Sequence, residues 1–89
     1  MNSRRTARFR DLDDQLPRHI QLQADRAVDR FQSDSQHPAL RLKRVHTTEP
    51  IVSARISRNY RALARAEGET YIWFWIGPHA EYERILGQR

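Results

Sequence analysis

The sequence predicts an α+β fold in which an N-terminal helical hairpin packs on a twisted antiparallel sheet of three to four strands, followed by a short C-terminal helix. Apolar residues recur with a helical period up to about Asp34, and from Leu40 the period changes to the alternation typical of strands. Turn-forming residues divide the second half into short segments. With 89 residues, the chain is expected to form a single domain over residues 1–89, with residues 1–5 as a loose tail.

The first half predicts two helices that meet at Pro17. The first covers Ser3–Gln15, with Ser3 or Thr6 as its N-cap. The second runs to about Asp34, with Pro17 in its first turn, where a missing N–H is tolerated. Its apolar stripe consists of Ile20, Ala24, Ala27, Val28 and Phe31. The charged residues between them, which include Arg26 and Arg30, are interpreted as solvated exterior.

The second half predicts short strands and a closing helix. The expected elements are strands at Leu40–Val45, Ile51–Ser57, Tyr60–Ala66 and Thr70–Gly77, then a helix at His79–Leu86. Arg58-Asn59 and the segment around Gly68 are expected to form hairpin turns. The last strand is apolar on both faces, so it is predicted to be internal.

Alternation along these strands predicts a sheet face that the helical hairpin does not cover. Its predicted members are Arg55, Arg61, Arg65, Tyr71, Trp73 and Trp75. Arginine beside wide aromatic rings is a combination that single-stranded nucleic acid binds well.

Positive charge is concentrated in the middle third of the chain. The net charge is +5, of which residues 1–39 contribute +1, residues 40–65 contribute +6 and residues 66–89 contribute −2. Fifteen of the sixteen basic residues are Arg, which suits bidentate contacts to phosphate. A solvated basic surface is the plain alternative, but a polyanionic partner, either nucleic acid or an acidic protein segment, is favoured.

Composition also predicts what the protein lacks. There is no Cys, so neither disulfides nor thiolate metal sites are possible, and the four His residues do not stand at metal-ligand spacing with acidic residues. We therefore expect no metal and no cofactor. The longest apolar run, Tyr71–Gly77, falls far short of the roughly 18 residues of a membrane span, so a soluble cytoplasmic protein is expected.

Several segments together resemble one protein family. They are HPALRLKR, SARISRNYRAL and IWFWIGPHAEYERIL, in this order after a helical hairpin. In this combination the chain resembles the RelE/ParE superfamily, the toxins of bacterial type II toxin–antitoxin systems, and is similar to its ParE-like branch of cytotoxic translational repressors. The likeness covers roughly residues 9–86. Two departures are that residues 1–8 offer no convincing first strand and that the middle of the chain has a single lysine.

The resemblance implies a toxin that cuts mRNA on the ribosome without a metal and is neutralised by an acidic segment of a cognate antitoxin. In such cleavage the 2′-hydroxyl attacks the adjacent phosphate, which requires an acid or base and cations around the phosphate. The catalytic candidates carried over are His79, with Tyr82 one helical turn away, and the phosphate-binding Arg61 and Arg55. Candidates for RNA binding are Lys43, Arg44, Arg58, Arg65, Trp73 and Trp75, with His46 as a further possible member.

Each candidate also has a plain structural interpretation. His79 could cap the last helix, Tyr82 could belong to the core, and Arg61 could pair with an acidic residue of that helix. The two tryptophans could form core or an antitoxin-docking surface. Two other functions also remain open: a non-enzymatic ParE-like inhibitor of DNA gyrase, and an inactive nucleic-acid-binding member of the fold.

Overall fold

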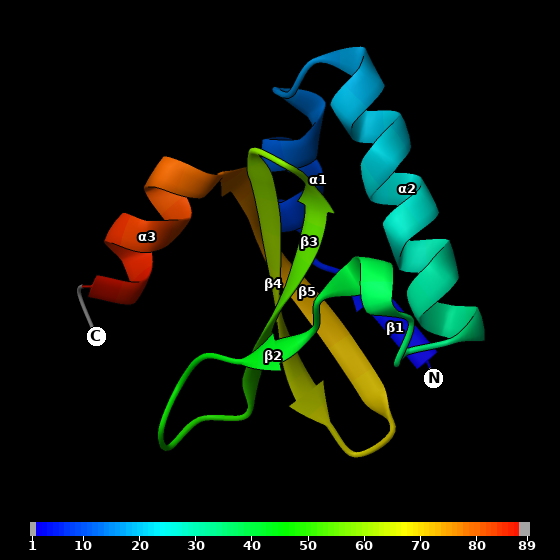
Figure 1. Cartoon of the computed structure of the whole chain (residues 1–89), viewed down its shortest axis with the longest axis vertical. Coiled ribbons are helices and arrows are strands. Elements are labelled where there is room, and N and C mark those ends of the chain that lie inside the picture. The colour runs from blue at the N-terminus through cyan, green and yellow to red at the C-terminus, as the bar shows by residue number, and fades with distance from the viewer. Residues whose placement is uncertain (1, 88–89) are drawn as a thin grey trace.

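The computed structural model describes residues 2–87 and has a mixed sheet flanked by helices (Figure 1). Its elements are β1 (Asn2–Arg5), α1 (Ala7–Asp14), α2 (Arg18–Ser33), the 3-10 turn η1 (Pro38–Leu40), β2 (Lys43–Arg44), β3 (Ile51–Ser57), β4 (Tyr60–Glu67), β5 (Thr70–Pro78) and α3 (His79–Gly87). The predicted α+β fold is confirmed, but the sheet has five strands rather than three to four. In this range no helix combines the length and apolar character needed to cross a membrane.

The strand order is β1-β5-β4-β3-β2, and β1 runs parallel to β5 while the other neighbours are antiparallel. The expectation of a loose tail at residues 1–5 is therefore wrong for Asn2–Arg5, which pairs with β5 from Thr70 to Trp73. An edge strand needs few apolar residues, because one side of its backbone remains open to solvent. Arg5 is further held by Asp25 of α2, with Nη1 2.9 Å from Oδ1.

The two N-terminal helices form the predicted hairpin with shifted boundaries. Because β1 occupies residues 2–5, α1 begins at Ala7 rather than Ser3, and the hydroxyl of Thr6 accepts a hydrogen bond from the backbone N–H of Phe9 at 3.1 Å. Pro17 is the N-cap of α2 and not a residue of its first turn. Both helices cover the same face of the sheet (Figure 1).

The strand predicted at Leu40–Val45 is mostly wrong. Leu40 ends η1 and is buried in the core, and Arg41 has a left-handed backbone with φ 45° that turns the chain. Only Lys43 and Arg44 pair with β3. The segment in which Leu alternates with basic residues therefore forms a turn with a buried leucine, followed by a very short edge strand.

A bulge in β5 decides which way its tryptophans point. Leu63 of β4 pairs with Trp75, whereas the next residue, Ala64, pairs with Trp73, so Phe74 is an extra residue in β5. The two tryptophans consequently lie on opposite faces, and the prediction that they share one face is wrong.

The face beneath the helices holds the larger core. Phe31 of α2 makes edge-on contacts with Tyr71 at 4.7 Å and with Trp73 at 5.4 Å between ring centroids. Tyr71 and Trp73 therefore belong to the helix-covered face and not, as predicted, to the basic one. On the other face Trp75 packs with Leu63 and Tyr82, and this smaller core seats α3.

Gly77 approaches the ring of Trp75 so closely that no side chain fits. A Cβ atom at residue 77 would lie 2.7 Å from Cζ2 of Trp75, whose side chain is buried and unable to retreat. We expect Gly77→Ala to lower the free energy of unfolding by about 1–3 kcal/mol, measured by urea denaturation. Gly87→Ala is the control, since a Cβ there meets nothing within 4 Å. Equal stability of both variants would contradict this packing.

Asp13 carries a buried carboxyl oxygen, Oδ1, without a hydrogen-bond partner. Burial, and then the charge of Asp25, raise the pKa of Asp13 above its ordinary 3.8. The folded state thus holds this proton more tightly than the unfolded state, so Asp13 lowers stability as the pH rises above 3.8. We expect Asp13→Asn to stabilise the protein at neutral pH and to lose this advantage in acid, measured by thermal unfolding against pH. The same gain from Asp14→Asn, an exposed neighbour, would contradict the explanation.

Candidate nucleic-acid interface

The candidate site lies where the β3–β4 hairpin meets the start of α3. Arg55 of β3 pairs with Arg61 of β4, which pairs in turn with Gly77 of β5. The backbone N–H of His79 donates to the carbonyl oxygen of Asn59 in the hairpin turn at 2.7 Å. Strand register therefore brings three of the predicted residues, Arg55, Arg61 and His79, to one end of the sheet.

His79 is the exposed titratable residue of this end. Its side chain is 43% exposed, and its Nε2 lies 3.4 Å from Oε1 of Glu83, one turn later on α3. Its ring also lies against the ring of Tyr82, with 5.5 Å between centroids. A carboxylate partner on one side and an aromatic ring beneath hold the imidazole in a defined orientation. Within residues 2–87, no group of three or more His, Asp or Glu is placed to hold a metal ion.

Tyr82 is buried and not at the surface of the site. It is 3% exposed, and its hydroxyl lies 3.2 Å from Oγ of Ser53, a buried residue of β3. A hydrogen bond between two buried hydroxyls satisfies both and fixes how α3 sits on the sheet. The phenol thus positions α3, and with it His79.

Arg61 binds the hairpin turn with one of its nitrogens. Nη1 donates to the carbonyl oxygens of Ser57 at 2.7 Å, Tyr60 at 2.9 Å and Arg58 at 3.3 Å. Nε and Nη2 make no hydrogen bond within residues 2–87, so the other edge of the guanidinium can meet a ligand. Burial, and then the neighbouring charge of Arg55, lower the pKa of Arg61 below its ordinary value.

Arg55 and Arg61 together form an uncompensated pair of cations. Among the described residues neither makes an ion pair with a carboxylate. Two like charges this close repel each other, and a bound anion would relieve the repulsion. Guanidinium groups bind phosphate in a bidentate manner, so a phosphate group fits this position by charge and by geometry.

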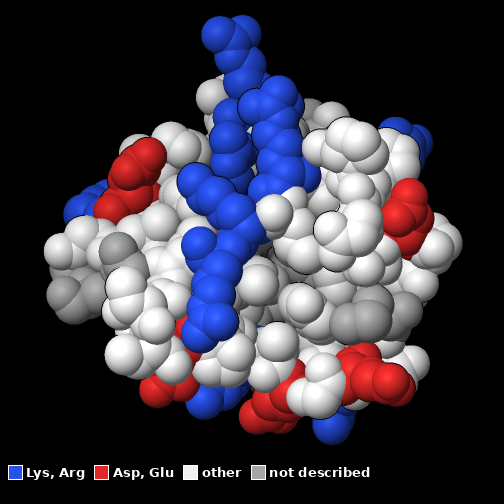
Figure 2. All heavy atoms as spheres, turned by 60° about the horizontal axis from the view of Figure 1, so that its bottom comes forward, with Lys and Arg blue, Asp and Glu red and all other residues white. Residues whose placement is uncertain are grey.

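The remaining basic candidates divide into available and neutralised residues. Lys43 and Arg44 of β2 and Arg58 of the hairpin turn are exposed. Arg65 lies at the other end of β4, where its guanidinium meets Glu49 at 2.7 Å and Glu67 at 3.8 Å. Seen from the end that carries β2, Lys and Arg side chains form a band, with Asp and Glu around its margin (Figure 2).

Of the predicted contacts to RNA, the two tryptophans are buried and His46 is held within its own loop. Trp73 and Trp75 are 1% and 5% exposed, so neither ring can stack on a base without unfolding the core around it. His46 is occupied in its own loop, where Nδ1 accepts hydrogen bonds from the backbone N–H groups of Thr48 at 3.2 Å and Glu49 at 2.9 Å.

Comparison with known proteins identifies the family. Residues 18–84 match the family described as the ParE-like toxin domain. The chain is a ParE-like toxin domain. It thus belongs to the RelE/ParE superfamily, as the sequence motifs predicted. No significant match was found among curated proteins.

The fold is shared with a solved toxin–antitoxin structure. The ParE-like domain is similar to a chain of the RelBE2 toxin–antitoxin complex from Mycobacterium tuberculosis, with a TM-score of 0.62 and 24% sequence identity. The match covers 86% of this domain and 95% of that chain. At this identity the likeness concerns the fold.

Sequence reasoning missed two members of the site in this ParE-like domain. Ser53 was not singled out, because its partnership with Tyr82 depends on how α3 crosses the sheet. Glu83 does have a signal in the sequence, since it stands four residues after His79 on one helix.

The hydrogen bond between Tyr82 and Ser53 can be tested directly. We expect Tyr82→Phe and Ser53→Ala each to lower the free energy of unfolding by about 1 kcal/mol. Each variant removes one hydroxyl of the pair and leaves the other buried without its partner. The double variant should lose less free energy of unfolding than the two single variants lose together, measured by a double-mutant cycle in urea. Strict additivity would show that the two hydroxyls do not interact.

Proposed function

We propose that this ParE-like domain is the toxin of a type II toxin–antitoxin system and acts in the cytoplasm as a metal-independent endoribonuclease that cuts mRNA on the ribosome. The observation that carries the proposal is the pair Arg55 and Arg61, neither of which forms an ion pair within the described residues, at the same end of the sheet as the partly exposed imidazole of His79. A phosphate-binding pair of cations next to an acid–base group is the minimum that RNA cleavage by the 2′-hydroxyl requires.

In the proposed reaction the 2′-hydroxyl of one nucleotide attacks its own 3′-phosphate and expels the 5′-oxygen of the next nucleotide. His79 either accepts the proton of the 2′-hydroxyl or donates one to the leaving oxygen, since an imidazole nitrogen can serve as a base or, when protonated, as an acid. Arg55 and the free edge of Arg61 bind the phosphate, whose negative charge grows as the bond to the attacking oxygen forms. Tyr82 supports His79 from below.

A cognate antitoxin is part of the same proposal. The solved structure that shares the fold is a toxin–antitoxin complex. The net charge of +5 on this chain makes an acidic antitoxin segment a suitable partner, since such a segment would cover the cations that otherwise bind RNA. Folding of that segment on the toxin surface would block access to the mRNA.

Two structural observations favour a second candidate, inhibition of DNA gyrase without catalysis. Tyr82 is buried, and Nη1 of Arg61 is engaged with backbone carbonyls. Of the four proposed catalytic residues, His79 alone is therefore an accessible acid or base. A toxin that only docks on a protein target would need no more than the basic surface around it.

The decisive test is primer extension on an mRNA in a purified translation system. We expect ribosome-dependent cuts within codons from the wild-type protein and a loss of cleavage of roughly 100-fold or more in His79→Ala, the usual contribution of a general acid or base. His19→Ala is the matched control, because His19 is an exposed helical histidine of α2.

Wild-type rates of cleavage by His79→Ala would remove His79 from the mechanism. If the wild-type protein leaves the mRNA intact but inhibits DNA supercoiling by purified gyrase, the endonuclease proposal fails and the second candidate takes its place. Intact mRNA together with unaffected gyrase and unaffected translation would identify an inactive member of the fold.

A further inference from the structure

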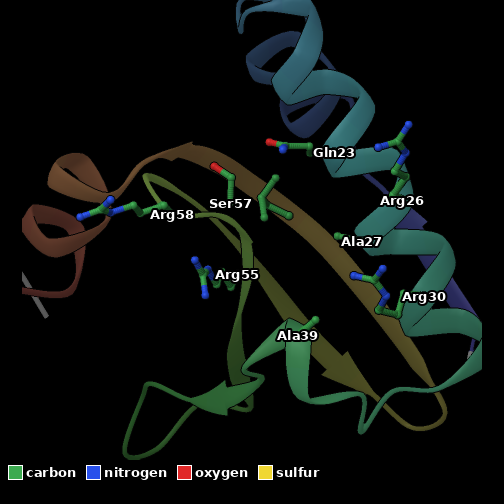
Figure 3. A pocket seen from close by; sticks show the side chains of 9 residues that line it. Gln23, Arg26, Ala27, Arg30, Ala39, Arg55, Ser57 and Arg58 are labelled. Carbon is green, nitrogen blue, oxygen red and sulfur yellow. The ribbon is translucent and has the colours of Figure 1, made fainter.

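An open groove of about 410 Å³ lies between α2 and β3 and shares Arg55 with the cluster around His79. Its lining consists of Gln23, Arg26, Ala27, Arg30, Ala39, Arg55, Ile56, Ser57 and Arg58. Figure 3 shows Gln23 and Arg30 extending from α2 toward β3, with Arg55 on the opposite wall.

The groove concentrates positive charge without neutralising it. Four of its lining residues are arginines, and no lining residue is Asp or Glu. Among the described residues, no carboxylate forms an ion pair with Arg26, Arg30, Arg55 or Arg58. Arg26 and Arg30 follow each other at a spacing of four residues on α2, so their side chains leave the helix on the same side, one turn apart. Such an arrangement favours a ligand with several successive negative charges.

Arg55 and Arg58 connect this groove to the proposed site of cleavage. Arg55 lines the groove and is also the neighbour of Arg61 in the sheet. Arg58 belongs to the hairpin turn whose next residue, Asn59, is hydrogen-bonded to the start of α3. Figure 3 shows the side chain of Arg58 directed away from α2, toward the side of α3. A strand bound at Arg55 and Arg61 can therefore continue into the groove without a break in the basic surface.

The lining also indicates which part of a nucleic acid the groove can contact. It contains no aromatic ring on which a base could stack, and its only large apolar residue is Ile56. A partner helix would need a row of apolar pockets, which three apolar residues, two of them alanine, do not provide. Arginine, Gln and Ser donors with little apolar surface suit the phosphates of a nucleic-acid backbone.

We propose that the groove formed by Gln23, Arg26, Arg30 and Arg55 binds the phosphate backbone of the RNA next to the bond that is cut. This inference rests on the proposed function and extends it from the reacting phosphate to its neighbours. The contacts are to the backbone, so they add affinity and fix the position of the strand without selecting its sequence.

The test measures binding and is independent of cleavage. A short fluorescein-labelled single-stranded RNA is titrated with the full chain at a series of salt concentrations, and the dissociation constant is obtained from fluorescence anisotropy. We expect Arg26→Gln/Arg30→Gln to weaken binding several-fold and to reduce the slope of log K against log salt by about 1.4, the value for two phosphate contacts of a single strand.

Two controls separate the groove from total charge and from a general effect of substitutions on α2. Arg8→Gln/Arg18→Gln removes the same charge from exposed helix positions outside the groove and should leave the salt slope at the wild-type value. His19→Ala, at an exposed position of α2 outside the groove, should bind RNA with wild-type affinity. Circular dichroism of each variant confirms that α2 is intact.

The outcomes distinguish this inference from the proposed function. If Arg26→Gln/Arg30→Gln binds RNA with the affinity and the salt slope of the wild-type protein, the proposal for the groove fails, even when the wild-type protein cuts mRNA. Equal losses of RNA affinity in both double variants also overturn the proposal, because the change in net charge would then explain the effect. If the Arg26→Gln/Arg30→Gln change weakens binding of polyglutamate but not of RNA, the groove is a docking site for an acidic protein and the proposal is overturned. Groove-dependent RNA binding without any cleavage supports the groove while the endonuclease proposal fails.

Discussion

The bulge in β5 is the constraint on which the two layers of the structure depend. By inserting Phe74 between paired positions, it directs Trp73 into the helix-covered core and Trp75 into the opposite one. Each face of the sheet thereby receives one tryptophan ring. Without the bulge, Trp75 would not join Leu63 in the apolar surface against which Tyr82 of α3 packs. His79, whose ring lies against Tyr82, would then not be held above the hairpin turn. The candidate site therefore depends on a backbone irregularity in the strand that leads to it.

The periodicity of the sequence predicted the helical hairpin, the β3–β4–β5 meander and the closing helix, because each buries an apolar face of its own. It did not predict β1, since an edge strand with Arg4 and Arg5 has no apolar alternation and owes its conformation to backbone pairing with β5. It also could not locate the bulge. Ile72–Ile76 is apolar throughout, and a run that is apolar on both faces contains no signal for a one-residue shift in register.

The site was predictable to the extent that strand register determines it. Arg55, Arg61 and His79 gather because a two-residue turn and adjacent strands leave no other arrangement. Burial of Tyr82 and neutralisation of Arg65 were not predictable, since the first depends on the crossing of α3 and the second on Glu49 in a distant loop. The arginines of α2 were interpreted as ordinary exterior, because a helical pattern shows which face is polar but not what that face adjoins.

The parallel pairing of β1 with β5 also has a consequence for how the chain folds. Asn2 is aligned with Thr70, and the backbone N–H of Thr6 donates to the carbonyl oxygen of Trp73 at 3.0 Å. Residues 2–5 thus reach their native positions only when β5 is present, and contacts between segments so far apart in the chain make folding slow. During translation the helical hairpin emerges without the sheet that covers its apolar stripe. The end of the sheet that gathers Arg55, Arg61 and His79 is likewise complete only when β3, β4, β5 and the start of α3 have come together.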